Sequence, residues 1–593
     1  MPQATTWQRF VDSWATKMVC CRLAAKKNRF PSVGISAKFA PRMLLLLPIW
    51  TVLFALVFGC GALCLRLMVR LGGTAFRHAS VLQVGWLGTA FLLAVLELGS
   101  LVVPVGRGLL VALAVLAAVG IIGARRSIAR CMRMARRRPL RVASIALAGM
   151  GVALAIAASA TQTVIWFDTY LYHLQVVKWT TAYAAVPGLA NLHSRLAFNS
   201  SFHLLAALTE TPWAGQSAHL ALPFLALMSG LHHLEFLVGR PGQGRAIGRA
   251  CAAVSGAYLA AFVWSYQLAS LSSDGALALL CTSAVLEMVA WRPRAAYRSG
   301  TGLAVMLALA ASAFTTKLGG LTLLLVAACL LAYLRGARRW LVISTLPGLL
   351  LAGYFARQAL LSGWLFFPIP IGDLHLSWSY PPADTMALFD LVRAWARLPN
   401  HAMSEVLAGG FWFWFRPWSV LFARSNEAVI LLLAVVVLVL RARWPAPLAP
   451  GPGVKASLAA SAASLAFWFT GAPDLRFGRI FFWLLLATAA APLLARAAQG
   501  RMGRIAGAAF ALLLLAWAGG LALKLPDARY MLAMPPLARF ESKRVVLGSG
   551  LQVLVPVEAA HARCGDAELP CTPMPARQRL RRPGDLGSGF LAE

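Results

Sequence analysis

The chain has 593 residues, of which 60% are hydrophobic and 13% charged, and this balance excludes a water-soluble protein because one core could not hide so much apolar surface. The net charge of +35 would suggest nucleic-acid binding if the basic residues formed one soluble face. They occur instead in short clusters between apolar segments, which is typical of membrane proteins, so we expect no nucleic acid among the partners.

The first 42 residues carry eight Lys or Arg and no apolar segment long enough for a signal peptide. We interpret residues 1–42 as a basic N-terminal extension. An apolar segment begins directly at Met43, so a start of translation at Met43 is the favoured alternative.

Apolar segments fill most of the chain from residue 43 to residue 523. A helix that crosses about 30 Å of hydrocarbon needs about 20 mostly apolar residues. The sequence therefore predicts an all-α polytopic membrane protein with about 14 transmembrane helices. The fourteen candidate spans lie near residues 43–65, 80–104, 108–123, 142–162, 217–238, 250–267, 274–291, 301–315, 318–334, 340–361, 428–441, 455–471, 479–495 and 504–523.

Every second linker between these spans contains a cluster of arginines and is therefore predicted to be cytoplasmic. The intervening linkers are then external, including long loops at 163–216 and 362–427 and a polar tail at 524–593. We predict a multi-pass protein of the bacterial inner membrane with its active side facing the periplasm. One conflict remains, because this alternation places the basic residues 1–42 outside. Either translation starts at Met43, which we favour, or one early span is miscounted.

The first long loop combines a carboxylate, an imidazole and aromatic rings. Asp168 stands where a span meets water, and Tyr172, His173, Lys178 and Trp179 follow it. On a helix, the aromatic and imidazole rings would share neighbouring turns with Asp168. Such a group can hold a sugar and deprotonate a hydroxyl, with Asp168 or His173 as the base. The alternative is an interfacial amphipathic helix whose aromatic residues mark the headgroup layer.

Further charged residues are predicted on the same external side, each close to a span end. They are Asp274, Lys317, Arg357, Asp474 and Arg476. Cations there can bind a phosphate or pyrophosphate while a lipid tail stays in the bilayer. Each residue alone would be explained by snorkelling from a helix end, but their shared side favours a site.

The second long loop and the tail carry weaker patterns. Residues 384–407 have helical periodicity, and FWFWFRPW at 411–418 is typical of an interfacial belt or re-entrant segment. Residues 545–557 predict one or two short strands in a small α/β or β-rich tail. Cys564 and Cys571 are separated by six turn-rich residues, so we predict a disulfide between them in an oxidising compartment.

Several of these features resemble the GT-C superfamily of membrane glycosyltransferases, which use polyprenyl-phosphate sugars. The resemblance consists of an Asp directly after a span, external Lys and Arg residues, and a later aromatic loop with Trp364, Phe366, Phe367 and Pro368. From about residue 43 to the end, the chain also resembles a largely uncharacterised family of bacterial membrane proteins with that architecture. The segments that carry this likeness are DTYLYHLQ, VPGLANLHSRLAFNSS, SGWLFFP, APDLRFG, CGDAELPCTP and the later GF.

The resemblance implies that Asp168 orients or deprotonates the acceptor, while Lys317 and Arg476 hold the donor phosphate. Two features depart from the superfamily pattern. Three spans precede the one that leads into Asp168, where the superfamily usually has its catalytic loop after the first, and the loop contains no Asp-x-Asp pair. The missing acid pair favours an inverting displacement that does not depend on a metal. The sequence implies no cofactor, and it does not exclude a divalent metal ion.

The expected function is therefore transfer of a sugar from a polyprenyl-phosphate carrier to an envelope glycan, lipid or protein. An O-antigen ligase or polymerase is an alternative, but such enzymes usually carry their Arg and His residues in one large late loop. A transporter or flippase of lipid-linked saccharides is a third possibility. It would be expected to have charged residues midway through spans and a repeated half, whereas these spans have their charges near the ends.

Overall fold

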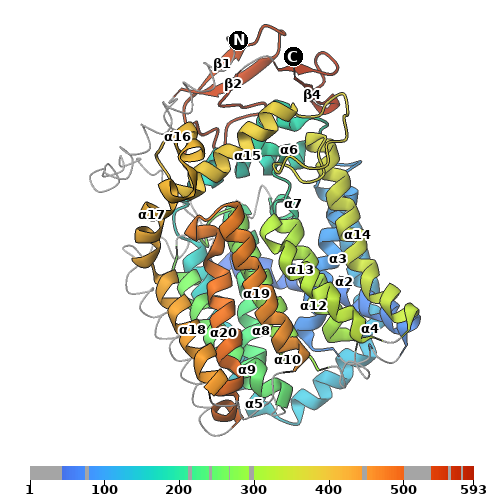
Figure 1. The fold of residues 1–593 in the computed structure, drawn as a ribbon. Helices are drawn as coiled ribbons and strands as arrows, with labels where there is room; N and C mark the ends of the chain where they lie inside the picture. The colour runs from blue at the N-terminus through green and yellow to red at the C-terminus, as the bar shows by residue number, and fades with distance from the viewer. Residues whose placement is uncertain are drawn as a thin grey trace.

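A computed structural model of the chain describes residues 43–73, 76, 79–210, 217–239, 243–265, 267–292, 300–334, 336–443, 451–499, 536–557, 562–575 and 578–592. Long helices run side by side along an elongated bundle, and the short strands of the tail cover one end of it (Figure 1). We call this end of the bundle, which also carries the short helices α6 and α15, the tail end. Residues 1–42 and the predicted span 504–523 lie outside the described residues.

Each of the remaining predicted spans coincides with a helix. The helices at these spans are α2 (Met43–Gly72), α3 (Val81–Gly99), α4 (Arg107–Arg136), α5 (Pro139–Ala160), α8 (Ala221–Val238), α9 (Gln243–Trp264), α10 (Ser273–Ala290), α12 (Thr301–Thr316), α13 (Leu321–Cys329), α14 (Ala337–Ser362), α18 (Asn426–Arg443), α19 (Pro452–Gly471) and α20 (Leu475–Gln499). Within the described part of the chain, nine helices are long and apolar enough to cross a membrane. A tenth results if α18 and the helix before it, bent by 80°, count as one span. The fold is thus that of an all-α polytopic protein, and the count of fourteen stays a prediction.

Small residues let the first helices approach one another closely. A Cβ atom at Gly61 would lie 1.8 Å from the carbonyl oxygen of Val84, and one at Gly88 would lie 1.6 Å from that of Val57. Helices α2 and α3 therefore touch backbone to backbone, which is a common way for helices to associate where lipid provides no hydrophobic drive between them.

One group of polar side chains buried between the helices is paired internally. At the end of α3 that lies away from the tail, His232 Nε2 is 3.0 Å from Glu287 Oε1, and Gln83 Nε2 donates to Glu287 Oε2 over 2.9 Å. Ser80 caps α3 by accepting from the backbone of Gln83 over 3.1 Å. These contacts tie α3, α8 and α10 together and satisfy groups that would otherwise be costly to bury.

The two predicted external loops form short helices at the tail end. The first contains a π-helical turn (Thr169–His173), α6 (Leu174–Ala182) and α7 (Ser201–Thr209), and the second contains α15 (Pro382–Arg397), α16 (Met403–Ala408) and α17 (Gly410–Ala423). The helical periodicity at 384–407 is thus confirmed, with a break where Asn400 adopts a φ of 69°. The 3₁₀ turns are Leu189–Asn191, Ser194–Ala197, Ser217–His219, Leu318–Gly320, Leu330–Tyr333 and Leu586–Ser588.

The tail contains two small antiparallel sheets. Strand β1 (Ser542–Val546) pairs with β2 (Gln552–Pro556), and β3 (Arg579–Leu580) pairs with β4 (Phe590–Leu591). This confirms the predicted strands at 545–557. A disulfide joins Cys564 to Cys571, the pair that the sequence suggests. Both long loops and the tail therefore lie at one end of the bundle, although the side of the membrane that this end faces stays a prediction.

Candidate functional site

Four charged side chains from four distant segments meet at the tail end, and we call them the charged cluster. They are Asp168, Asp274, Lys317 and Arg476. Arg476 Nη1 lies 2.9 Å from Asp168 Oδ2, and its Nε lies 3.6 Å from Asp274 Oδ2. Lys317 Nζ pairs with the other oxygen of Asp274. Acid and base thus alternate, and the side chains are only 11–34% exposed, so their charges are partly shielded from water and interact strongly.

The ends of helices place these four residues. Asp274 lies in the first turn of α10, whose preceding Ser272 accepts from the backbone of Gly275 over 3.4 Å. Lys317 follows the last residue of α12, and Arg476 lies in the first turn of α20. Asp474 does not join the ion pairs. Its carboxylate accepts from the backbone N–H of Arg476 over 2.9 Å and so caps the start of α20.

Two aromatic rings that the sequence reading missed lie against the cations. The Arg476 guanidinium carbon is 4.8 Å from the ring centre of Phe477 and 5.7 Å from that of Trp166. The Lys317 ammonium lies 3.9 Å from the Phe477 ring centre. Such contacts stabilise cations in partly desolvated places. The sequence could have indicated these two rings only by their position next to predicted site residues. Trp166 stands two residues before Asp168, and Phe477 directly follows Arg476.

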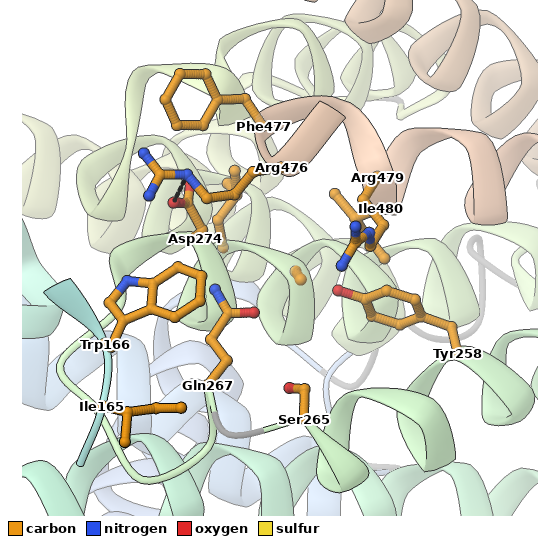
Figure 2. Close-up of a pocket in the computed structure, with 12 residues that line it drawn as sticks. Ile165, Trp166, Tyr258, Ser265, Gln267, Asp274, Arg476, Phe477, Arg479 and Ile480 are labelled. Carbon is orange, nitrogen blue, oxygen red and sulfur yellow. Dashed lines mark ion pairs between the residues drawn. The ribbon is translucent and has the colours of Figure 1, made fainter. Parts of the chain in front are cut away.

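A cavity of about 430 Å³ opens beside the charged cluster. Figure 2 shows Asp274 and Arg476 above Trp166 and Gln267, with the hydroxyl of Tyr258 directed towards Arg479 on the other side. Arg479 in turn pairs with Glu427 at the start of α18, with Nε 2.5 Å from Oε1. The volume lies in the range of small-molecule pockets, and the wall combines cations, an indole and amide and hydroxyl groups. The arrangement can hold an anionic group at Arg476 beside a polar, ring-shaped group at Trp166.

Residues 43–483 match the sequence model of a family described as Domain of unknown function (DUF8201). The chain belongs to this family. No curated protein and no solved structure matches it. The family region includes the entire charged cluster and ends before the tail with its disulfide.

In this family member, His173 is buried away from the ion pairs. Its ring centre lies 4.3 Å from that of Tyr172 and 4.7 Å from that of His203, and neither ring nitrogen has a hydrogen-bond partner among the described residues. Burial, followed by the charges of His203 and Arg476, holds the pKa of His173 well below its usual value. The predicted role as a base that contacts the acceptor therefore does not fit, because other rings enclose the imidazole and its lowered pKa makes it a weak base. Sequence reading also missed its neighbour His203.

Tyr172 lies between this buried pair and the charged cluster. Burial raises the pKa of its hydroxyl, and the negative charges of Asp168 and Asp274 raise the pKa further. Tyr172 therefore keeps its proton and can donate a hydrogen bond. Its ring centre lies 5.8 Å from that of Phe198, at nearly a right angle.

Lys178 and Trp179 point to the tail, contrary to the expectation that they share the site with Asp168. Lys178 Nζ lies 2.7 Å from Asp566 Oδ1 and also donates to the Asp566 carbonyl over 2.6 Å. Trp179 packs edge-on against Phe590, with ring centres 5.8 Å apart. For Trp179, which regular helical spacing would place on the face of Asp168, the physical reason is the π-helical turn at Thr169–His173, where the N–H of Leu174 donates to the carbonyl of Thr169. This wider turn rotates later residues away from the face that carries Asp168.

Arg357 lies in a separate buried group, so its predicted place among the phosphate-binding cations is not supported. Its three nitrogens donate to Ser100 Oγ, Asn199 Oδ1 and Thr180 Oγ1, each over 3.2 Å. Only 5% of the residue is exposed, and the buried carboxylate of Glu97 interacts with it electrostatically. Arg357 thus joins the end of α3 to α6 and α14, and three of its five N–H donors are used in these contacts.

The disulfide loop of the tail rests on the segment that follows Asp168. The backbone N–H of Gly565 donates to the carbonyl of Tyr170 over 2.7 Å, and Gln175 Nε2 donates to the carbonyl of Ala567 over 2.9 Å. Among the described residues, no group of three or more His, Cys, Asp or Glu side chains is placed to hold a metal ion. In the charged cluster, both carboxylates are already paired with cations.

Proposed function

We propose that the protein is a membrane glycosyltransferase of the GT-C type that moves a sugar from a polyprenyl-phosphate carrier to an envelope glycan, lipid or protein. The proposal includes about fourteen transmembrane helices, a place in the bacterial inner membrane and an active side in the periplasm. One observation carries it: Asp168, Arg476, Asp274 and Lys317 form a continuous row of ion pairs beside a cavity with an indole in its wall.

The row of ion pairs suggests how a donor would prepare the site. A phosphate is a stronger partner for a guanidinium and an ammonium together than one carboxylate is. When the donor phosphate binds Arg476 and Lys317, it competes with Asp168 for Arg476. Binding thus releases the Asp168 carboxylate, which then becomes available as a base only in the presence of donor.

The transfer itself would be an inverting displacement. The acceptor hydroxyl oxygen bonds to the anomeric carbon, its proton passes to Asp168, and the bond from that carbon to the phosphate oxygen breaks. The bonding electron pair leaves with the phosphate, and Arg476 and Lys317 stabilise the developing negative charge. Tyr172 can donate to a sugar or phosphate oxygen, while Trp166 offers a face on which the sugar ring can stack.

A second candidate, transport of lipid-linked saccharides, is favoured by one observation. Glu97 and Arg357 are buried inside α3 and α14, and both oxygens of Glu97 have no hydrogen-bond partner among the described residues. Ionisable groups within spans are costly and often mark transport pathways. Because a transporter needs no base at Asp168, the experiment that follows separates the two functions.

Asp168→Asn tests the proposed function, with Asp390→Asn as the matched control. Asp390 pairs with Arg393 on the surface helix α15, 3.6 Å apart, so the control removes a similar charge at the same end of the bundle. Purified protein in proteoliposomes would receive polyprenyl-phosphate carrying a radiolabelled sugar, together with a membrane extract as acceptor. We expect Asp168→Asn to reduce transfer roughly 100-fold or more and Asp390→Asn to leave it unchanged. Equal transfer by both variants, or passage of the labelled lipid across the bilayer that depends on the protein and occurs without transfer, would reject the proposal.

A further inference from the structure

Helix α17 has an aromatic outer face and an aromatic inner face. Trp414 and Trp418 point inward, and Trp418 has its ring centre 6.0 Å from that of Trp468 on α19. On the outer face, Phe411, Trp412 and Phe413 are 47%, 64% and 43% exposed. So much exposed aromatic surface on one short helix indicates contact with something other than water.

The direction of α17 indicates what it contacts. After Arg424 and Ser425, the chain bends by 80° into α18, whose outward side chains, such as Leu432 and Val436, are exposed and aliphatic. Figure 1 shows α17 at the tail end of α18. A helix that lies across the end of an aliphatic, lipid-length helix is placed at the level of the lipid headgroups, where Trp and Phe are enriched.

Charge agrees with this placement. Arg416 on α17 and Arg424 directly after its last residue are exposed, and arginine beside interfacial aromatic rings pairs with lipid phosphates. We propose that α17 lies in the membrane–water interface and binds the lipid headgroup layer through Phe411, Trp412 and Phe413. The occupant of this face is the bilayer that the bundle spans.

The inner face of α17 connects the same helix to the charged cluster. Trp418 Nε1 donates to the carbonyl of Pro473 over 2.7 Å, and Trp468 Nε1 donates to the carbonyl of Asp474 over 2.7 Å. These two carbonyls belong to the residues three and two positions before Arg476, whose backbone N–H donates to the Asp474 carboxylate. Trp418 is thus a positioning residue, because through it the interface helix fixes the segment that presents Arg476. The lipid contact of α17 and its effect on the position of Arg476 do not depend on the reaction that the charged cluster performs.

Nitroxide labels test the lipid contact. The full-length protein, with Cys20, Cys21, Cys131 and Cys329 replaced by Ser, would carry a label at Trp412→Cys or Phe413→Cys in vesicles of phosphatidylethanolamine and phosphatidylglycerol. Leu432→Cys on α18 is the control for hydrocarbon and Val546→Cys on β1 is the control for water, and both positions are more than 60% exposed. We expect labels on α17 to collide with oxygen more than with a nickel chelate, at a depth between the two controls. Collision rates like those at Val546, or protection from both reagents as under a second protein copy, would overturn the proposal.

Hydrogen exchange tests the positioning role. Trp418→Phe removes the indole N–H and keeps an aromatic ring, while Trp412→Phe makes the same change on the outer face. We expect Trp418→Phe to speed exchange of the amides of Arg476 and Phe477, which both donate to Asp474, by roughly threefold to tenfold. Trp468→Phe should act in the same direction and Trp412→Phe should not. Unchanged exchange in both inner variants would show that these indoles do not position Arg476.

Discussion

Two residues of the segment after α5 make an instructive comparison. Asp168 and Lys178 each form an ion pair with a residue far along the chain, Arg476 and Asp566 respectively. The pair of Asp168 continues into a second acid and a second base and is partly shielded from water. The pair of Lys178 does not continue into further charged side chains. The two cations are about equally exposed, 32% for Lys178 and 34% for Arg476, but the Asp566 side chain is 52% exposed and that of Asp168 only 18%. An ion pair therefore indicates a site only when further charges and aromatic rings converge on it. An ion pair without such neighbours only holds one segment of the chain against another.

The largest effect should come from the shielded pair. Arg476→Lys keeps the positive charge but loses the planar fork that reaches Asp168 and Asp274 together. We expect donor turnover in proteoliposomes to fall about 100-fold, the usual result of removing one group that stabilises developing charge. Arg393→Lys on α15 is the matched control and should change turnover less than twofold. If Lys178→Ala reduced turnover as strongly as Arg476→Lys, the distinction between the two pairs would fail.

A smaller effect is expected behind the cluster, at His203. Its Nε2–H donates to the carbonyl of Leu271 over 3.2 Å, and burial lowers the pKa of His203 from 6.5 to about 4. Because the unfolded chain binds a proton below pH 6.5 and the folded protein does not, stability is fully present above pH 6.5 and is lost as pH falls towards 4. Between pH 6.5 and 5 the loss is about 2 kcal/mol.

His203→Gln can keep the hydrogen bond to Leu271 but has no titrating group. The melting temperature in detergent should therefore fall less between pH 6.5 and 5 for this variant than for the unmodified protein. Parallel pH dependences of the two proteins would show that His203 is not held neutral by burial.

The smallest effect is expected at Lys178. An exposed ion pair contributes at most about 1 kcal/mol, so Lys178→Ala should leave the melting temperature of the helix bundle nearly unchanged. The tail loses its ion pair with α6, so limited proteolysis should cut the tail somewhat faster at residues 562–575. An unchanged cleavage rate would contradict the role of this pair in holding the tail, and a clear fall in the melting temperature of the bundle would break the comparison itself.

Much of the site could be predicted from residues that stand beside a span. Asp168, Asp274, Lys317 and Arg476 each lie at a helix end, and the alternation of basic linkers assigns these ends to the same side. The strands of the tail and the pairing of its cysteines also follow from local patterns. All of these inferences depend on neighbours in sequence, which a single chain displays directly.

The remaining features depend on partners that sequence spacing does not show. Lys178 meets Asp566 across 388 residues, and nothing near Lys178 indicates that a tail residue will reach it. A π-helical turn rotates Trp179 away from Asp168, although regular α-helical spacing would keep them together. Arg357 resembles a ligand-binding arginine by position, but Ser100, Thr180 and Asn199 use its donors.

The central claim is that Asp168 and Arg476, 308 residues apart, face each other in one site. Cysteine cross-linking in native membranes tests it most directly, with exposed cysteines replaced and a short bifunctional thiol reagent. We expect Asp168→Cys with Arg476→Cys to cross-link readily, and Lys178→Cys with Asp566→Cys to do so as a control for folding. Lys178→Cys with Arg476→Cys should not cross-link. If the control pair reacts while the pair at 168 and 476 does not, or if the pair at 178 and 476 reacts instead, the proposed site is wrong.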